Sequence, residues 1–385
     1  MDVDVASLLS YINVAGSLTS TSNSLTISQG ALQGTGTMNL SYVEIGTLGS
    51  VTFSGTLTAD RFVNGGAALA ISGGIIVNDS LILSSGSITF NAGSTLTMNS
   101  NSNIKVDAGS IAISGGTLAA TSNYNVIYVG SSKTSGIETG ISAGAHNVWV
   151  NMTDSSQIVT MGNDITISGT MYNNTGKVAL GTHTLKLMGD YVSTMNGKIS
   201  GAATSRLMLG LSNSSSSTIA LAAGSQFQYL EMNSGTSPSV NITGNFSVDT
   251  IYVKSGSAAF ADASKLTMET NGVFIMEDGT FTLGTGSFVG TNSYSVLYKG
   301  VNKFSSYELS GSGLQNVTLN LASLSNTVSL SNNLAVSGLL NMNMGYLYLN
   351  GYDLSINGTY SSTSNSAFSG HVSSTLKINN PSVAF

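Results

Sequence analysis

Charge is the scarcest property of this sequence. Lysine, arginine, aspartate and glutamate make up 8% of its 385 residues, whereas an ordinary soluble domain has roughly 25%. The net charge of -6 is spread along the whole chain, so that no basic patch forms. We therefore expect no nucleic-acid partner.

Cysteine is absent and proline occurs only twice. Without cysteine the chain has no disulfides and no thiolate metal sites, so its rigidity must come from another source. Because proline lacks a backbone N–H, its scarcity fits strands that are hydrogen-bonded on both sides. No run of about 18 apolar residues is present either, so we expect no membrane insertion.

Glycine and small polar residues take the place of charge. The chain has 45 glycines and a dense background of serine, threonine and asparagine, yet 41% of its residues are hydrophobic. Those hydrophobic residues recur in short alternating runs, which argues against disorder and for strands.

Apolar residues recur as i, i+2 pairs, with about seven residues between successive pairs. Each pair is the inward face of a short strand, and the glycine, asparagine or serine between pairs supplies a tight corner. Three such units make a coil of roughly 21 residues, which predicts an all-β, right-handed parallel β-helix, or β-solenoid. The pairs between residues 51 and 113 are Val51/Phe53, Leu69/Ile71, Leu81/Leu83, Ile88/Phe90, Leu96/Met98, Ile104/Val106 and Ile111/Ile113.

A longer repeat overlies the coils. The segment GSITFNAGSTLTM from Gly86 reappears as GSAAFADASKLTM from Gly256, an offset of 170 residues, and NYNVIYVG matches SYSVLYKG in the same register. Later matches slip by one residue. We therefore predict one continuous β-solenoid over residues 1–385, with a tandem repeat of about 169–170 residues covering approximately 24–192 and 193–361, and partial copies at the ends.

The segments NDITISGTMYNNTGKVALGTHTLKLMGDY and NNLAVSGLLNMNMGYLYLNGYDLSINGTY resemble the Ser/Thr/Gly/Asn-rich β-helical repeat regions of Bacteroidota-type cell-surface adhesins. The resemblance extends over most of the chain. It implies the parallel β-helical stalk of an exported protein, of the kind often sent out through type IX secretion. The expected location is therefore extracellular, at the cell surface.

The function we expect is that of a non-catalytic structural and adhesive rod, a stalk or filament segment that binds surface glycans or neighbouring copies of itself. One alternative is a subunit that assembles end to end into a fibre or sheath through uncapped coils. The others are a phage tail-fibre segment and a polysaccharide-active β-helix enzyme.

The enzyme alternative needs two or three carboxylates on one sheet face with a basic residue nearby. No such cluster is evident, and His146, His183 and His371 fall in unrelated settings. The sequence also lacks the Gly-Gly-x-Gly-x-Asp repeat that binds calcium. We therefore expect no catalysis, no metal and no cofactor.

Charges kept in both copies mark a candidate ligand site after each NYNVIYVG-like strand. One interpretation pairs the lysine and the glutamate as a surface ion pair that steadies a loop, worth about 0 to 1 kcal/mol. The other is a ligand contact, in which the first tyrosine offers its face to a sugar ring while the charges bind hydroxyls at the rim. Buried tyrosine ladders would explain the same tyrosines. The candidate residues are Tyr124, Lys133, Glu138, Tyr294, Lys303 and Glu308.

Two Asp-(Ser/Thr)-apolar triplets, Asp79-Ser80-Leu81 and Asp249-Thr250-Ile251, also fall at equivalent positions. The triplet resembles the O-glycosylation acceptor used by Bacteroidota, which would make Ser80 and Thr250 modification sites. Because strands rich in hydroxyls generate such triplets readily, plain strand residues are the alternative.

Overall fold

The computed structural model describes residues 3–120, 123–139, 145–212, 217–235, 239–260 and 263–380. Strands account for 68% of the chain, and no α-helix occurs among the described residues. Parallel sheets form a β-solenoid of about 17 turns with about 21 residues per turn. The predicted fold class and the predicted coil length are therefore confirmed.

The chain divides into two compact units. Unit 1 comprises Met1–Ala179 and Val192–Gly197, and unit 2 comprises Leu180–Tyr191 and Lys198–Phe385. The boundary expected between the two sequence copies lies between residues 192 and 193. This position falls in Val192–Gly197, the short segment of unit 1 that stands in the sequence between two segments of unit 2. Unit 1 thus holds most of the first copy and unit 2 holds most of the second.

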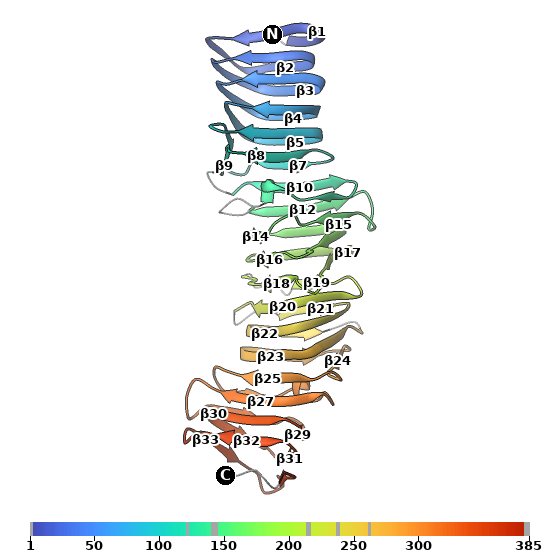
Figure 1. Ribbon diagram of the computed structural model, residues 1–385, viewed down its shortest axis with the longest axis vertical. Helices are drawn as coiled ribbons and strands as arrows, with labels where there is room; N and C mark the ends of the chain where they lie inside the picture. The colour runs from blue at the N-terminus through green and yellow to red at the C-terminus, as the bar shows by residue number, and fades with distance from the viewer. Residues whose placement is uncertain are drawn as a thin grey trace. The chain divides into compact units, whose positions relative to one another are not determined.

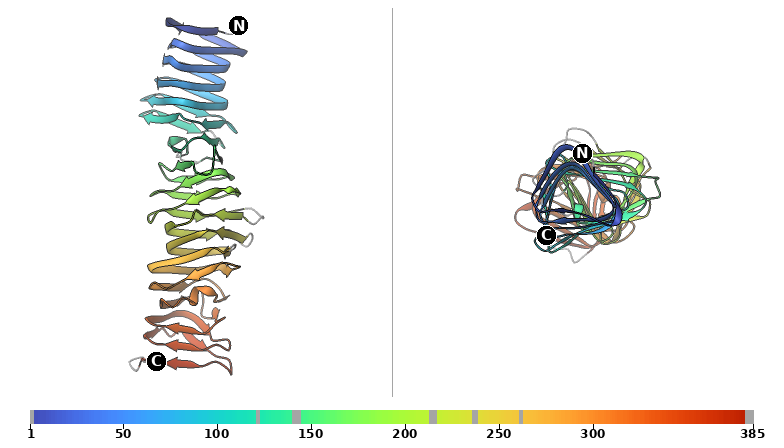
Figure 2. Two further views of the ribbon diagram at one scale, coloured as in Figure 1. Left: turned by 90° about the vertical axis from the view of Figure 1, so that its right-hand side faces the viewer. Right: turned by 90° about the horizontal axis from the view of Figure 1, so that it is seen from above.

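Unit 1 begins with five long strands, each of which follows the chain around most of one turn. They pair in chain order, each parallel to the next, and Figure 1 shows them as stacked blue bands. Viewed from above, the blue turns outline a triangle (Figure 2). Each turn thus contributes to three faces. The strands are β1 (Val3–Val14), β2 (Ser17–Gly34), β3 (Thr37–Phe53), β4 (Thr56–Ile71) and β5 (Gly74–Asn91).

Later turns of unit 1 consist of shorter strands. They are β6 (Thr95–Met98), β7 (Asn103–Val106), β8 (Ser110–Ser114), β9 (Thr117–Ala120), β10 (Asn125–Gly130), β11 (Lys133–Thr134), β12 (Asn147–Met152), β13 (Ile158–Thr160), β14 (Ile165–Ile167) and β15 (Met171–Ala179), with one 3-10 turn, η1 (Ile137–Thr139). Residues of β17 (Tyr191–Ser200) belong to both units.

Unit 2 has the same construction. Its strands are β16 (Thr184–Leu187), β18 (Arg206–Leu209), β19 (Ser217–Ala220), β20 (Ser225–Asn233), β21 (Ser239–Thr243), β22 (Asn245–Phe260), β23 (Lys265–Leu283), β24 (Ser287–Val289), β25 (Tyr294–Tyr298), β26 (Lys303–Phe304), β27 (Leu314–Asn320), β28 (Thr327–Ser329), β29 (Leu334–Val336), β30 (Leu339–Tyr348), β31 (Leu354–Ile356), β32 (Thr359–Ser362), β33 (Ser366–Ser369) and β34 (Leu376–Ile378). A second 3-10 turn, η2 (Tyr307–Leu309), follows β26.

Apolar side chains line up from turn to turn inside unit 1. One column runs in register through Val43, Phe62, Leu81, Ile104 and Val126, and each of these residues is at most 1% exposed. Parallel pairing places like residues at the same height of each turn, so that they pack into a continuous dry interior. The inward pairs predicted from the sequence are buried, except that the last residue of the last pair is only half-buried.

The interior of unit 2 is more aromatic. Seven rings form a chain of neighbours with centroids 4.9 to 6.3 Å apart, most of them edge to face. This is the arrangement that aromatic pairs favour. The rings belong to Phe227, Phe246, Phe260, Phe274, Phe281, Phe288 and Tyr294.

Asparagine amides are stacked along the corners of unit 1. Asn147 Nδ2 donates to Asn125 Oδ1 at 3.0 Å, and Asn125 Nδ2 donates to Asn103 Oδ1 at 3.1 Å. Another corner takes a left-handed conformation, with φ of 63° at both Asn101 and the equivalent Asn271. Hydrogen bonding of amides thus stabilises the turns where charge is scarce.

Candidate functional site

Each copy contains a buried cluster of two tyrosines and one glutamate. In unit 1, Tyr124 Oη donates to the backbone carbonyl of Glu138 at 2.8 Å, and Tyr128 Oη donates to Glu138 Oε1 at 2.8 Å. The backbone N–H of Gly136 donates to the same carboxylate oxygen at 2.7 Å. We name this arrangement the buried Tyr–Glu cluster.

Unit 2 repeats the cluster at an offset of 170 residues. Tyr294 Oη donates to the carbonyl of Glu308 at 2.8 Å, Tyr298 Oη donates to Glu308 Oε1 at 2.5 Å, and Ser306 N donates to that oxygen at 2.7 Å. Both clusters tie a 3-10 turn to the strand ten to fourteen residues before it. Of the two charged residues kept in both copies, the glutamate therefore points inward.

Local sequence explains how the cluster forms. Successive strand residues point to opposite faces, so Tyr124, Val126 and Tyr128 all point into the interior. Gly130 then turns the chain with φ of +77°, and a Cβ there would lie 2.2 Å from Asp107 Oδ1. Only glycine fits this corner. The 3-10 turn that follows brings the glutamate back over the tyrosine hydroxyls.

The lysines do not pair with the glutamates. Lys133 Nζ donates to the carbonyls of Val129 and Ser131, the latter at 2.7 Å. Lys303 Nζ likewise donates to the carbonyls two and four residues before it. Each lysine therefore closes its own corner. The predicted surface ion pair is wrong, because the glutamate is buried with other partners.

The tyrosine faces are not available to a ligand. Tyr124 and Tyr294 are 0% and 1% exposed, and Glu138 and Glu308 are 3% and 0% exposed. The interpretation in which these tyrosines stack on sugar rings is therefore wrong. The structure brings four of the six candidate residues together as two internal clusters, as the explanation by buried tyrosines requires.

Burial governs the protonation of the cluster in unit 2. It raises the pKa of the Glu308 carboxyl, although the hydrogen bonds from Tyr298 and from the backbone of Ser306 oppose that shift. Within the described part of the chain, Glu308 Oε2 is buried without a hydrogen-bond partner. Burial also raises the pKa of Tyr298 well above its usual value. Burial thus shifts both groups toward their neutral forms.

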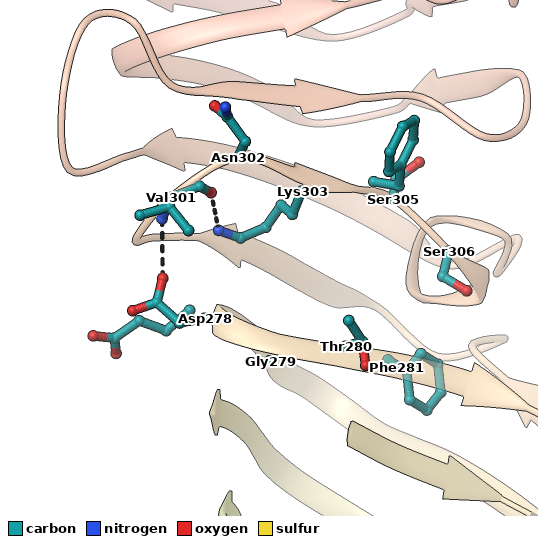
Figure 3. Close-up of a pocket in the computed structure, with 11 residues that line it drawn as sticks. Asp278, Gly279, Thr280, Phe281, Val301, Asn302, Lys303, Ser305 and Ser306 are labelled. Atoms are coloured by element: carbon teal, nitrogen blue, oxygen red, sulfur yellow. Dashed lines mark hydrogen bonds between the residues drawn. The ribbon is translucent and has the colours of Figure 1, made fainter. Parts of the chain in front are cut away.

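A hollow of about 360 Å³ lies on the outer side of this segment of unit 2. Figure 3 shows Asp278 and Val301 at one end of it and Thr280 and Ser306 at the other. Val301 N donates to Asp278 Oδ1 at 3.0 Å, which ties two turns together. Lys303 lines this hollow and therefore lies at the surface, whereas Glu308 of the same copy is buried.

Three aromatic residues that the sequence pattern did not single out lie on this side of unit 2. Phe304 is 67% exposed, Tyr346 is 40% exposed and Tyr348 is half-buried. They occupy outward positions of β26 and β30. In the adjacent register, Val328 of the intervening strand β28 and Leu347 of β30 point inward and are buried. We name Phe304, Tyr346 and Tyr348 the aromatic face. Alternation along the strands is the one signal that could have revealed it.

The aromatic face continues over a second hollow. This hollow has a volume of about 540 Å³ and is lined by both tyrosines together with Phe368 and hydroxyl residues. The same positions in unit 1 carry no aromatic ring. There, Thr134 pairs with Thr160, which pairs with Ala179, and Lys177 pairs with Ile158.

The two proposed acceptor hydroxyls lie at equivalent places. Ser80 in β5 and Thr250 in β22 are both half-buried, directly before a buried aliphatic residue. Ser80 Oγ donates to Asp79 Oδ2 at 3.2 Å. Their modification stays a prediction, which an intact mass measurement tests.

Comparisons of the chain with protein-family models, with curated proteins and with solved structures found no match. The fold itself defines the class, a β-solenoid with tandem-repeat character. Among the described residues, no group of three or more His, Asp or Glu side chains could hold a metal ion. None of the helical segments in that part of the chain could span a bilayer.

Proposed function

We propose that this chain is a non-catalytic extracellular structural and adhesive element, a stalk or filament segment of a bacterial surface adhesin. The observation that carries the proposal is the duplication of the buried Tyr–Glu cluster. In a chain nearly empty of charged residues, a glutamate kept in both copies fastens a 3-10 turn to the strand that precedes it. Such a use of charge fits a protein whose task is to keep its shape.

The repeated architecture supports the structural part of the proposal. Each turn pairs with its neighbouring turns, so a solenoid can lengthen without changing its cross-section. Serine, threonine and asparagine occupy many of the exposed positions, and charged residues are few. A repeated surface of this kind suits adhesion through many weak contacts, because linked sites bind far more tightly together than one site does alone.

Localisation tests the proposal directly. Antibodies raised against the chain are expected to label intact cells of the source bacterium as strongly as permeabilised cells, and external protease should remove the label. A label that appears only after permeabilisation would contradict an extracellular role.

Three further measurements separate the alternatives. Particles coated with the purified chain should adhere to glycan-coated surfaces and to one another. Electron micrographs showing fibres that lengthen with protein concentration would favour an end-to-end polymerising subunit instead. Release of reducing sugars from polysaccharides would favour an enzyme.

A further inference from the structure

The aromatic face of unit 2 has an ordered layout. Phe304 pairs with Ser329, which pairs with Tyr348, so the two rings share one column with a hydroxyl residue between them. In the adjacent column, Thr327 pairs with Tyr346. Neighbouring turns lie about 4.8 Å apart, which places the two rings of the first column about 10 Å apart along the axis of unit 2.

Each end of the aromatic face adjoins a hollow. Phe304 lines the hollow of about 360 Å³, and the two tyrosines line the hollow of about 540 Å³. A ligand that follows the rings therefore meets concave surface at both ends. Such concavity with a few polar groups is typical of binding sites for small and chain-like molecules.

The charged groups beside the aromatic face are already engaged within the protein. Asp278 accepts from the backbone of the next turn, and Glu277 Oε2 accepts from Tyr252 Oη. Lys303 Nζ is held by two corner carbonyls. No charged residue lines the second hollow as the structure describes it. The face therefore offers rings, hydroxyls and amides, and little free charge.

These groups match the chemistry of a neutral sugar chain. The C–H faces of sugars pack on aromatic rings, and sugar hydroxyls bond to groups such as Thr327, Ser329 and Asn302. A protein partner would find rings interrupted by hydroxyl residues in place of the contiguous apolar centre that interfaces usually have. Among the residues that line the first hollow, an acidic glycan would meet the carboxylates of Glu277 and Asp278 and a lysine, Lys303, that is already hydrogen-bonded.

We propose that the aromatic face of unit 2 binds a neutral glycan chain laid along successive turns. This inference rests on the adhesive part of the proposed function and assigns it to one face of one copy. The equivalent residues of unit 1, Thr134, Lys177 and Ala179, provide no rings, so that unit lacks this site.

Titration of the full chain with neutral hexasaccharides tests the site. The probes are a β-linked glucose hexamer and a β-linked mannose hexamer, with a galacturonate hexamer as the charged counterpart. Removing the rings with F304A/Y346A/Y348A should weaken neutral-glycan binding about tenfold or more, which corresponds to about 1.4 kcal/mol. Because these side chains lie at the surface, the variant should keep the strand content of the wild type.

Two matched variants act as controls. W149A/Y172A removes an outward stacked ring pair of unit 1, whose centroids are 4.8 Å apart, and should leave binding unchanged. T134F/K177Y/A179Y builds the aromatic face on unit 1 and should raise the stoichiometry from one glycan per chain to two.

The outcomes separate the two claims. Binding by wild type that F304A/Y346A/Y348A retains would overturn the site and leave adhesion standing. Failure of the wild type to bind either neutral hexamer would overturn both the site and the glycan-binding part of the proposed function. Tighter binding of the galacturonate hexamer, or self-association lost in the triple variant, would assign the face to another partner and overturn the inference.

Discussion

At the corner beside the buried Tyr–Glu cluster, unit 1 presents Thr134 to solvent and unit 2 presents Phe304. Behind these two side chains, the tyrosines, the glutamate and the lysine make the same hydrogen bonds in both units. The two copies therefore share their internal hydrogen bonds, while their outward side chains differ. Inward positions are constrained by close packing, whereas outward positions of a strand are free to change.

The interiors also differ within that constraint. Ile104 and Ile111 of unit 1 correspond to Phe274 and Phe281 of unit 2, and all four are buried. The two phenylalanine rings lie 4.9 Å apart, edge to face. Both rings come from the single strand β23, so an aliphatic pair in one unit and a ring pair in the other fill the interior at equivalent positions of a turn.

The largest expected effect is common to both units. Phe90 and Phe260 are equivalent and each is 0% exposed, so F90A and F260A should each destabilise their own unit by about 3 to 5 kcal/mol. Urea unfolding, with hydrogen exchange to locate the loss, measures this. S287A, at an exposed position, serves as the control. If only one of the two variants lost stability, the interiors of the two units would not be equivalent at this position.

A smaller effect should distinguish the two clusters. Y128F and Y298F each remove a hydrogen bond to a buried carboxylate, which costs about 1 to 3 kcal/mol. The loss should be greater for Y298F, because the second carboxylate oxygen of Glu308 has no partner within the described chain. Urea unfolding of both variants measures the difference, with Y346F as the surface control. Losses of equal size would remove the contrast between the clusters.

Acidity should change the stability of unit 2 through Glu308. Burial raises the pKa of this carboxyl in the folded state, so the unfolded chain releases its proton first as the pH rises. Unit 2 should therefore be fully stabilised below the ordinary pKa of glutamate and lose stability from there up to the raised pKa. E308Q should abolish that loss, which unfolding curves at a series of pH values measure. The same pH dependence in wild type and E308Q would exclude this carboxyl as its source.

The smallest expected effect concerns the aromatic face. F304A removes a ring that is 67% exposed, so the unfolding free energy should change by no more than about 0.5 kcal/mol. Thermal unfolding measures this change. A loss well above that size would mean that Phe304 supports the fold and that the outer face is not independent of the interior.

Much of the fold could be predicted because a solenoid repeats one local rule. Apolar pairs such as Leu81/Leu83 and Leu96/Met98 alternate with polar residues, and burial requires that alternation in every turn. The offset between the copies likewise placed Tyr294 and Tyr298 at positions equivalent to Tyr124 and Tyr128. These features depend on near neighbours in the sequence.

The site could be predicted only in part. Equivalence of the copies singled out Glu138 and Glu308, but it could not tell a surface charge from a buried one. That depends on a 3-10 turn, which folds the carboxylate inward over two hydroxyls. The lysine was expected to face the glutamate, yet it reaches back to carbonyls of its own corner.

The sequence by itself determined the period of the coil, the inward residues and the duplication, because the alternation and the repeat length are properties of the order of residues in the chain. Only the tertiary structure decided that Phe304 and Tyr348 would share one column and that the glutamate carboxyl of each copy would lie inside. Those contacts join residues many positions apart. They depend on the length of each intervening turn, which sets the register between strands.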